Sequence, residues 1–116
     1  MTDSWVDRID FARGGGLVPV VVQDWRTRDV LMVGYANREA VERTLAGGSL
    51  YFWSRSRNEL WHKGERSGNV LQIRRLALDC DGDALLAEIE PATGETPNCH
   101  TGAESCFVAP SPGPWE

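Results

Sequence analysis

The chain has 116 residues, of which 41% are hydrophobic, and this length and composition predict one domain with a modest core. The formal net charge of −5 argues against binding to bulk nucleic acid or to an anionic membrane, since both need a basic face. No stretch reaches the roughly 20 apolar residues of a membrane span, and the N-terminal residues lack the pattern of a secretory signal. We therefore expect a cytoplasmic location, where the three cysteines stay reduced.

The first half of the chain contains a predicted hairpin followed by one helix. The valine-rich residues 17–25 and the apolar residues 30–36 are predicted strands, joined by the polar turn between them. The helix is predicted over 38–47, because Asn37 is a favoured N-cap residue and a pair of glycines ends the pattern.

The second half of the chain is predicted to be mostly β-structure. The fold class is therefore α+β, with mostly antiparallel strands and one main helix. Residues 1–13 and 108–116 show no regular pattern, and we expect flexible tails there, at the two ends of a single domain over 1–116. The remaining strands are predicted at residues 49–56, 58–63, 70–80 and 84–90, with a loop at 64–69 and loop-like chain from Pro91 onward.

The segment LDCDGDA, residues 78–84, places three carboxylates and a thiol within five residues. Asp81 and Gly82 between two apolar runs are typical of a two-residue hairpin turn, and a plain hairpin needs no metal. The spacing also imitates a calcium loop that ends at Glu90, but Ala84 stands where such a loop needs glycine.

A hairpin and a metal site are compatible at this segment. If strand geometry persists to residue 81, Asp79 and Asp81 point to one face and Cys80 to the other. Asp83 follows the turn and can rejoin the first two carboxylates. Hard carboxylates suit Mg²⁺, whereas a thiolate suits Zn²⁺, so the pattern predicts two separate sites if metals bind.

The segment NCHTGAESC, residues 98–106, carries the other two cysteines and a histidine. Cys80, Cys99 and Cys106 could supply three thiolates to a zinc ion, and water in a fourth position would make that site catalytic. The alternatives are inert buried thiols or a redox pair, although the spacing of Cys99 and Cys106 is not that of a thioredoxin-like motif. His100 is a candidate ligand, a candidate general acid or base, or a loop residue.

Five segments in this order, GLVPVVVQD, VLMVGYANREA, WSRSRNELWHKG, LDCDGDALL and CHTGAESCF, resemble the phosphoribosyl-AMP cyclohydrolases of histidine biosynthesis. The resemblance runs from about Gly16 to Phe107. It implies an intertwined, cytosolic homodimer that uses Zn²⁺ and Mg²⁺ to hydrolyse the N1–C6 bond in the adenine ring of 1-(5-phosphoribosyl)-AMP. It also implies that Cys80, Cys99 and Cys106 bind zinc, drawn from both subunits, and that Asp79, Asp81 and Asp83 bind Mg²⁺.

The resemblance guides a mechanism as well. Zinc would deliver hydroxide to C6 at neutral pH, and His100 is the candidate to carry a proton to the departing N1. Arg66 stands where the family usually has a small hydroxyl residue, and Ala36 where it tends to have methionine. The candidate substrate-binding residues are Trp53, Arg55, Arg57, Lys63, Ser67 and Asn69. The alternative for this segment is an exposed basic strand with two core tryptophans.

Three other functions fit parts of the sequence. A zinc-stabilised module could bind nucleotides or single-stranded RNA without catalysis, but the net charge of −5 does not supply the basic groove that such RNA binding needs. A thiol redox protein would need no metal. A nucleotide deaminase would attack the same carbon, but the chain has no H-x-E and P-C-x-x-C signature.

Overall fold

The computed structural model describes residues 5–65, 70–91 and 105–113, which form the predicted α+β fold with mostly antiparallel strands and one main helix. The predicted elements are present, although the strands expected at 17–25, 49–56, 58–63 and 70–80 are shorter. The intertwined homodimer stays a prediction. The elements are η1 (Ala12–Gly14), β1 (Val18–Asp24), β2 (Val30–Ala36), α2 (Arg38–Gly47), β3 (Tyr51–Ser54), β4 (Glu59–His62), β5 (Leu71–Leu78) and β6 (Leu85–Pro91).

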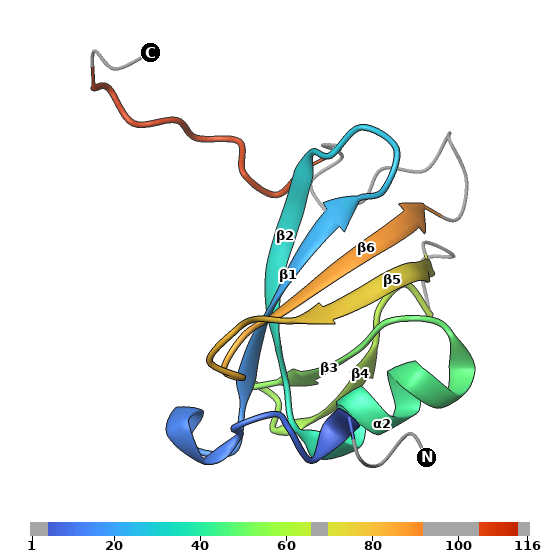
Figure 1. Ribbon diagram of the computed structural model, residues 1–116. Helices are drawn as coiled ribbons and strands as arrows, with labels where there is room; N and C mark the ends of the chain where they lie inside the picture. The colour runs from blue at the N-terminus through green and yellow to red at the C-terminus, as the bar shows by residue number, and fades with distance from the viewer. Residues whose placement is uncertain (1–4, 66–69, 92–104, 114–116) are drawn as a thin grey trace.

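Two antiparallel hairpins join to form a four-stranded sheet in the order β2-β1-β6-β5 (Figure 1). β1 pairs with β2 and β5 with β6, and the two hairpins meet through parallel pairing of β1 with β6. Val20 of β1 lies level with Gly34 of β2 and with Leu85 of β6. β3 and β4 form a separate antiparallel pair.

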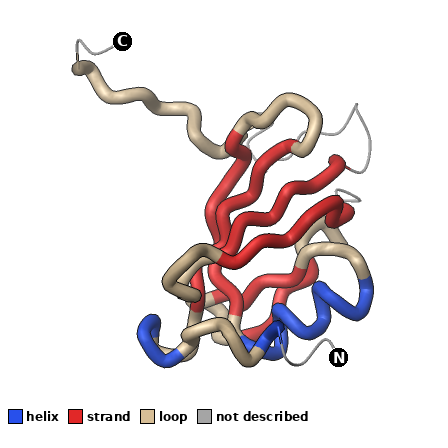
Figure 2. The backbone as a smooth tube through the Cα atoms, in the orientation of Figure 1, coloured by secondary structure: helices blue, strands red, loops and turns tan. Residues whose placement is uncertain are grey.

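The core lies between one face of this sheet and a layer made by α2 and the β3–β4 hairpin (Figure 2). Strand side chains alternate between faces, and Val18, Val20 and Val22 of β1 are all buried on the core face. Phe52 of β3 and Val41 of α2 are buried opposite them.

The helix α2 begins and ends where the sequence predicts. The Asn37 side chain accepts a hydrogen bond of 2.9 Å from the backbone N–H of Ala40, which is the N-cap bond. Gly48 ends the helix with a φ of 77°, which glycine adopts without strain. The Thr44 hydroxyl accepts a hydrogen bond of 2.9 Å from the backbone N–H of Tyr51 and so fixes α2 to β3. No helix in the described part of the chain is long and apolar enough to span a membrane.

Residues 5–13 differ from the flexible tail that the sequence suggests. Val6 and Ile9 are only 1% and 6% exposed and belong to the core. Residues 5–13 are therefore part of the fold. The sequence did not indicate this, because the core side chains of the segment follow no recognisable periodicity. At the other end, Phe107 and Val108 are exposed, and residues 109–113 run away from the body in Figures 1 and 2.

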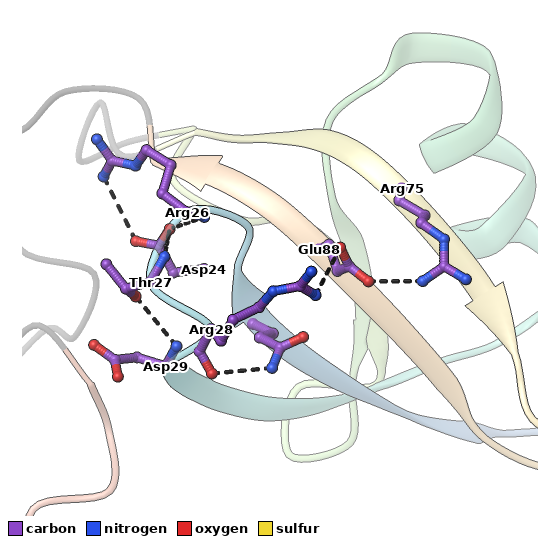
Figure 3. Close-up of polar contacts among 8 residues, drawn as sticks. Asp24, Arg26, Thr27, Arg28, Asp29, Arg75 and Glu88 are labelled. Carbon is purple, nitrogen blue, oxygen red and sulfur yellow. Dashed lines mark hydrogen bonds and ion pairs between the residues drawn. The ribbon is translucent and has the colours of Figure 1, made fainter.

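The face of the sheet away from the core carries a buried carboxylate. Glu88 of β6 is 4% exposed, and Arg75 donates to it at 2.7 Å while Arg28 lies at 3.6 Å (Figure 3). Asp24 organises the neighbouring β1–β2 turn by accepting hydrogen bonds from the backbone N–H groups of Arg26 and Thr27. Burial alone would raise the pKa of Asp24, but these donors and the Arg26 guanidinium outweigh burial and lower the pKa.

Candidate metal turn and aromatic groove

The acidic segment forms the connection between β5 and β6. The last strand pair joins Leu78 to Leu85, so strand geometry ends before Asp79 and does not persist to residue 81. The backbone N–H of Gly82 donates to the Asp79 carbonyl at 3.1 Å, which places Cys80 and Asp81 in the middle of the turn. The hairpin prediction is confirmed. The two-residue turn centred on Asp81 and Gly82 is wrong, because Gly82 instead closes the turn at a φ of 75°.

The turn brings the three aspartates together, although the sequence prediction expected Asp79 and Asp81 to share one face of a strand. Asp79, Asp81 and Asp83 each offer a carboxylate oxygen, and these oxygens all lie within 4.8 Å of one another. The Asp79 carboxylate also accepts a hydrogen bond of 3.0 Å from the backbone N–H of Asp83. This bond is the main reason that the pKa of Asp79 lies below its ordinary value. The cluster therefore offers hard carboxylate oxygens of the kind that Mg²⁺ prefers.

The N-terminal segment packs directly on the acidic turn. The backbone N–H of Asp10 donates to the Gly82 carbonyl at 2.6 Å. A Cβ at Gly82 would lie 2.8 Å from the carbonyl oxygen of Arg8, so only glycine allows this approach. The Arg13 guanidinium lies 3.0 Å from Asp83 and 3.5 Å from Asp10. Sequence reasoning missed Arg13, because its contact with Asp83 spans 70 residues and has no local signal.

The two described cysteines lie at opposite ends of the sheet. Cys80 is exposed in the β5–β6 turn, beyond the level of Leu85. Cys106 is exposed beside the first residues of β2, where its backbone N–H donates to the Leu31 carbonyl at 2.7 Å. Leu31 lies three residues along β2 from Gly34, which is level with Leu85. At about 3.3 Å per residue and 4.8 Å per strand, Leu31 and Leu85 are about 10 Å apart along the strands and about 10 Å apart across them. Cys80 lies farther away still, beyond Leu85.

Several sequence-predicted site residues lie outside the described residues. These are Cys99, His100, Ser67 and Asn69, together with the departure from the family pattern at Arg66.

An open groove with a volume of about 490 Å³ lies between β2 and the β3–β4 hairpin. Trp53 and Arg55, two of the predicted substrate residues, line it. Arg57 and Lys63 are not among its lining residues, and the Lys63 ammonium lies 5.5 Å from the Trp61 ring centre. The lining residues are Met32, Val33, Gly34, Tyr35, Phe52, Trp53, Ser54, Arg55, Ser56 and Trp61.

Local sequence fixes the turn that carries Arg55. The Ser54 hydroxyl accepts a hydrogen bond of 3.2 Å from the backbone N–H of Arg57, and the Ser54 carbonyl accepts one of 2.7 Å from Asn58. Asn58 has a φ of 57°, a conformation that asparagine tolerates better than most residues. The turn holds the Arg55 guanidinium 3.9 Å from the centre of the Tyr35 ring.

Gly34 sets the floor of the groove. A Cβ at this position would lie 2.5 Å from the ring of Phe52, so the absence of a side chain lets β3 approach β2 closely. Phe52 in turn packs at 5.5 Å from the Trp61 ring.

A histidine of β4 that sequence reasoning did not select, His62, has several side-chain partners. The two ring nitrogens of His62 lie 2.9 Å from the Ser49 hydroxyl and 3.2 Å from the Glu65 carboxylate. Its ring stacks on Tyr51, its strand partner, at 4.3 Å. His62 lies within the segment WSRSRNELWHKG, but residue types alone do not reveal its contacts with Ser49 and Tyr51, which come from the preceding strand region.

The chain is similar to known proteins over most of its length. A model of the phosphoribosyl-AMP cyclohydrolase family matches residues 32–108. A phosphoribosyl-AMP cyclohydrolase of Cenarchaeum symbiosum is 51% identical over 102 residues, which cover 88% of this chain and 92% of the relative. The corresponding protein of Lactiplantibacillus plantarum is 52% identical over 101 residues, covering 87% and 91%. The protein of that name from Nitrosopumilus maritimus is 49% identical over 105 residues, covering 90% and 94%.

Proposed function

The chain belongs to the phosphoribosyl-AMP cyclohydrolase family, and we propose that it hydrolyses the N1–C6 bond in the adenine ring of 1-(5-phosphoribosyl)-AMP during histidine biosynthesis. The observation that carries this proposal is 51% identity to a relative of that name over 88% of the chain. The product is the ring-opened aminomethylideneamino imidazole carboxamide, and no ammonia is released.

Asp79, Asp81 and Asp83 are our proposed Mg²⁺ ligands. Their oxygens lie within 4.8 Å of one another, and the turn is open to solvent. Mg²⁺ usually keeps several waters and binds one or two protein carboxylates plus substrate phosphate oxygens. The three carboxylates fit this preference, since an exposed turn leaves room for those waters and for a phosphate group of the substrate.

Cys80, Cys99 and Cys106 are our proposed zinc ligands. Two thiolates on one zinc ion lie within about 5 Å of each other, because each Zn–S bond is about 2.3 Å. Cys80 and Cys106 of one chain are much farther apart, since they lie at opposite ends of the sheet. The proposal therefore includes a homodimer in which Cys80 of one chain meets Cys99 and Cys106 of the other.

The protein side chains supply binding and proton transfer in this proposal. When bound, zinc supplies a nucleophile at neutral pH by lowering the pKa of water. His100 follows Cys99 in the chain and would give a proton to N1 as the bond breaks. The aromatic and basic residues would bind the base and the two phosphates; these are Trp53, Arg55, Arg57, Lys63, Ser67 and Asn69.

An absorbance assay tests the reaction. Purified protein is loaded with Zn²⁺ and Mg²⁺ and mixed with phosphoribosyl-AMP, and formation of the carboxamide is followed by ultraviolet absorbance. We expect turnover that a strong chelator abolishes and that Cys99→Ala removes. No ring opening by folded, metal-loaded protein would contradict the proposal, and release of ammonia would favour deamination instead.

A matched pair of variants tests the Mg²⁺ site. Asp81→Asn removes one carboxylate from the acidic turn, whereas Asp29→Asn removes an exposed carboxylate from the β1–β2 turn. We expect Asp81→Asn to raise the Mg²⁺ concentration needed for half-maximal activity about tenfold or more, and Asp29→Asn to leave it unchanged. Equal effects of the two variants would contradict the assignment.

A further inference from the structure

We propose that the groove between β2 and the β3–β4 turn binds the substrate nucleotide, and that Tyr35 positions the Arg55 guanidinium toward its phosphate. This inference rests on the proposed function and deepens it, because it names the groove as the subsite and Tyr35 as a residue that sequence reasoning did not select.

The size and lining of the groove fit a nucleotide. Its volume of about 490 Å³ lies within the range of about 300–1,000 Å³ that is usual for small-molecule sites. Four aromatic side chains line the groove. Trp53 and Trp61 offer faces on which a flat base can stack, because Phe52 is buried and Arg55 lies over the Tyr35 ring. The Ser54 and Ser56 hydroxyls can bond a ribose. The described residues that line the groove include one cation, Arg55, and no acidic side chain. An aromatic groove with a positive charge suits a flat heterocycle that carries a phosphate.

The stacked geometry keeps Arg55 able to bind an anion. Its guanidinium lies 3.9 Å from the Tyr35 ring centre, and no carboxylate among the described residues forms an ion pair with it. A ring face attracts a cation without neutralising its charge. The N–H donors of a guanidinium lie in its plane, so a ring on one face leaves the edges open for two parallel bonds to phosphate.

The rest of the fold holds this pair before any ligand arrives. Tyr35 belongs to β2, where it pairs with Pro19 of β1. Gly34, its neighbour, lets the Phe52 ring approach and so brings β3 against β2. The Ser54 hydrogen bonds then close the turn that presents Arg55. Such preorganisation reduces the entropy lost on binding, because the side chains are ordered in advance.

The position of β2 also indicates how the nucleotide would be oriented in the groove. Leu31 accepts the hydrogen bond from Cys106, and the next four residues of β2, 32–35, line the groove. Tyr35 lies four residues beyond Leu31, which is about 13 Å at 3.3 Å per residue. A phosphate at Arg55 would therefore place the other end of an extended nucleotide toward the Cys106 end of β2.

AMP and adenosine are suitable probes, because they differ only by the phosphate. Their dissociation constants are measured by equilibrium dialysis against the metal-loaded protein, without any turnover. We expect Tyr35→Leu, which removes the ring, to weaken AMP binding about 3- to 10-fold and to change adenosine binding less than about twofold. We expect Tyr35→Phe, which keeps the ring face, to bind AMP within about twofold of the unsubstituted protein.

A double-mutant cycle with Arg55→Gln separates positioning from a structural role. If Tyr35 acts through Arg55, Tyr35→Leu has no further effect on AMP binding once Arg55 is replaced. Equal losses for AMP and adenosine, or additive effects of the two substitutions, would overturn the inference. Circular dichroism and the Tm of each variant confirm that the compared proteins are folded.

The results also separate this inference from the proposed function. In the turnover assay, Tyr35→Leu should raise KM with little change in kcat, as expected for lost binding that is equal in ground and transition states. Phosphate-selective AMP binding without turnover would support the groove and contradict the cyclohydrolase activity. Turnover together with AMP binding that Tyr35→Leu does not change would support the activity and contradict the assignment of the groove.

Discussion

Complementation between two inactive variants tests whether each zinc site needs two chains. Cys80→Ala and Cys106→Ala each remove one thiolate from every site, so each variant alone should lose zinc and activity. In one chain the strand residues beside these cysteines, Leu31 and Leu85, are already about 10 Å apart along the strands and about 10 Å apart across them. A shared site in a twofold dimer therefore takes Cys80 from one chain and Cys106 from the other.

The expected activity of the mixture follows from counting sites. A mixed dimer has one site that lacks both thiolates and one site with both intact. After unfolding and refolding an equal mixture, half of the dimers are mixed, so roughly a quarter of all sites are intact. We expect roughly a quarter of the unsubstituted activity and of its zinc content, both measured on the purified dimer.

The control is each variant refolded alone, and it should stay inactive. If the mixture is as inactive as its components although mixed dimers form, the cysteines come from one chain. In that case the opposite positions of Cys80 and Cys106 in the sheet would have to change before zinc binds. Activity in either variant alone would show instead that the missing thiolate is not a zinc ligand.

Three further predictions concern single positions. Gly34→Ala should lower the free energy of unfolding by about 1–3 kcal/mol in urea denaturation, because its Cβ would lie 2.5 Å from the Phe52 ring; an unchanged midpoint would contradict this packing. Asp24 has a lowered pKa when folded, so its stabilisation is present above its unfolded pKa and is lost as pH falls through the folded value. Asp24→Asn should therefore flatten the fall in stability between pH 5 and pH 2 by about 1 kcal/mol, whereas Asp29→Asn should leave it unchanged. Gly82→Ala should weaken Mn²⁺ binding to the acidic turn, measured by electron paramagnetic resonance, because its φ of 75° and a contact of 2.8 Å force the turn to move; unchanged affinity would contradict this.

Local signals predicted most of the secondary structure. Asn37 and the glycines after α2 mark the helix ends, because caps depend on residues within one turn. Alternating valines mark β1, because successive side chains of a strand point to opposite faces and every second one is buried here. The parallel pairing of β1 with β6 has no such signal, since it joins residues more than 60 positions apart, such as Val20 and Leu85.

The sequence pointed to the residue types of the acidic turn, but not to how the structure arranges them. The acidic segment identified Asp79, Asp81 and Asp83, but the alternation argument assumed a strand where a turn forms. Arg13 and Tyr35 were missed, because each acquires its role from a partner distant in the sequence. Patterns of residue type reveal the donors that a site can offer, whereas long-range packing decides which of them meet.

The contact between Arg13 and the acidic turn changes the electrostatic repulsion among the three carboxylates. Three carboxylates whose oxygens lie within 4.8 Å repel one another, and such repulsion favours opening of the turn. The Arg13 guanidinium, 3.0 Å from Asp83, offsets part of that repulsion from within the chain. Arg13 therefore helps to hold the three carboxylates together from within the chain. If a cation bound here, as we propose, it would meet carboxylates that the fold already keeps close, and the chain would not have to refold around it.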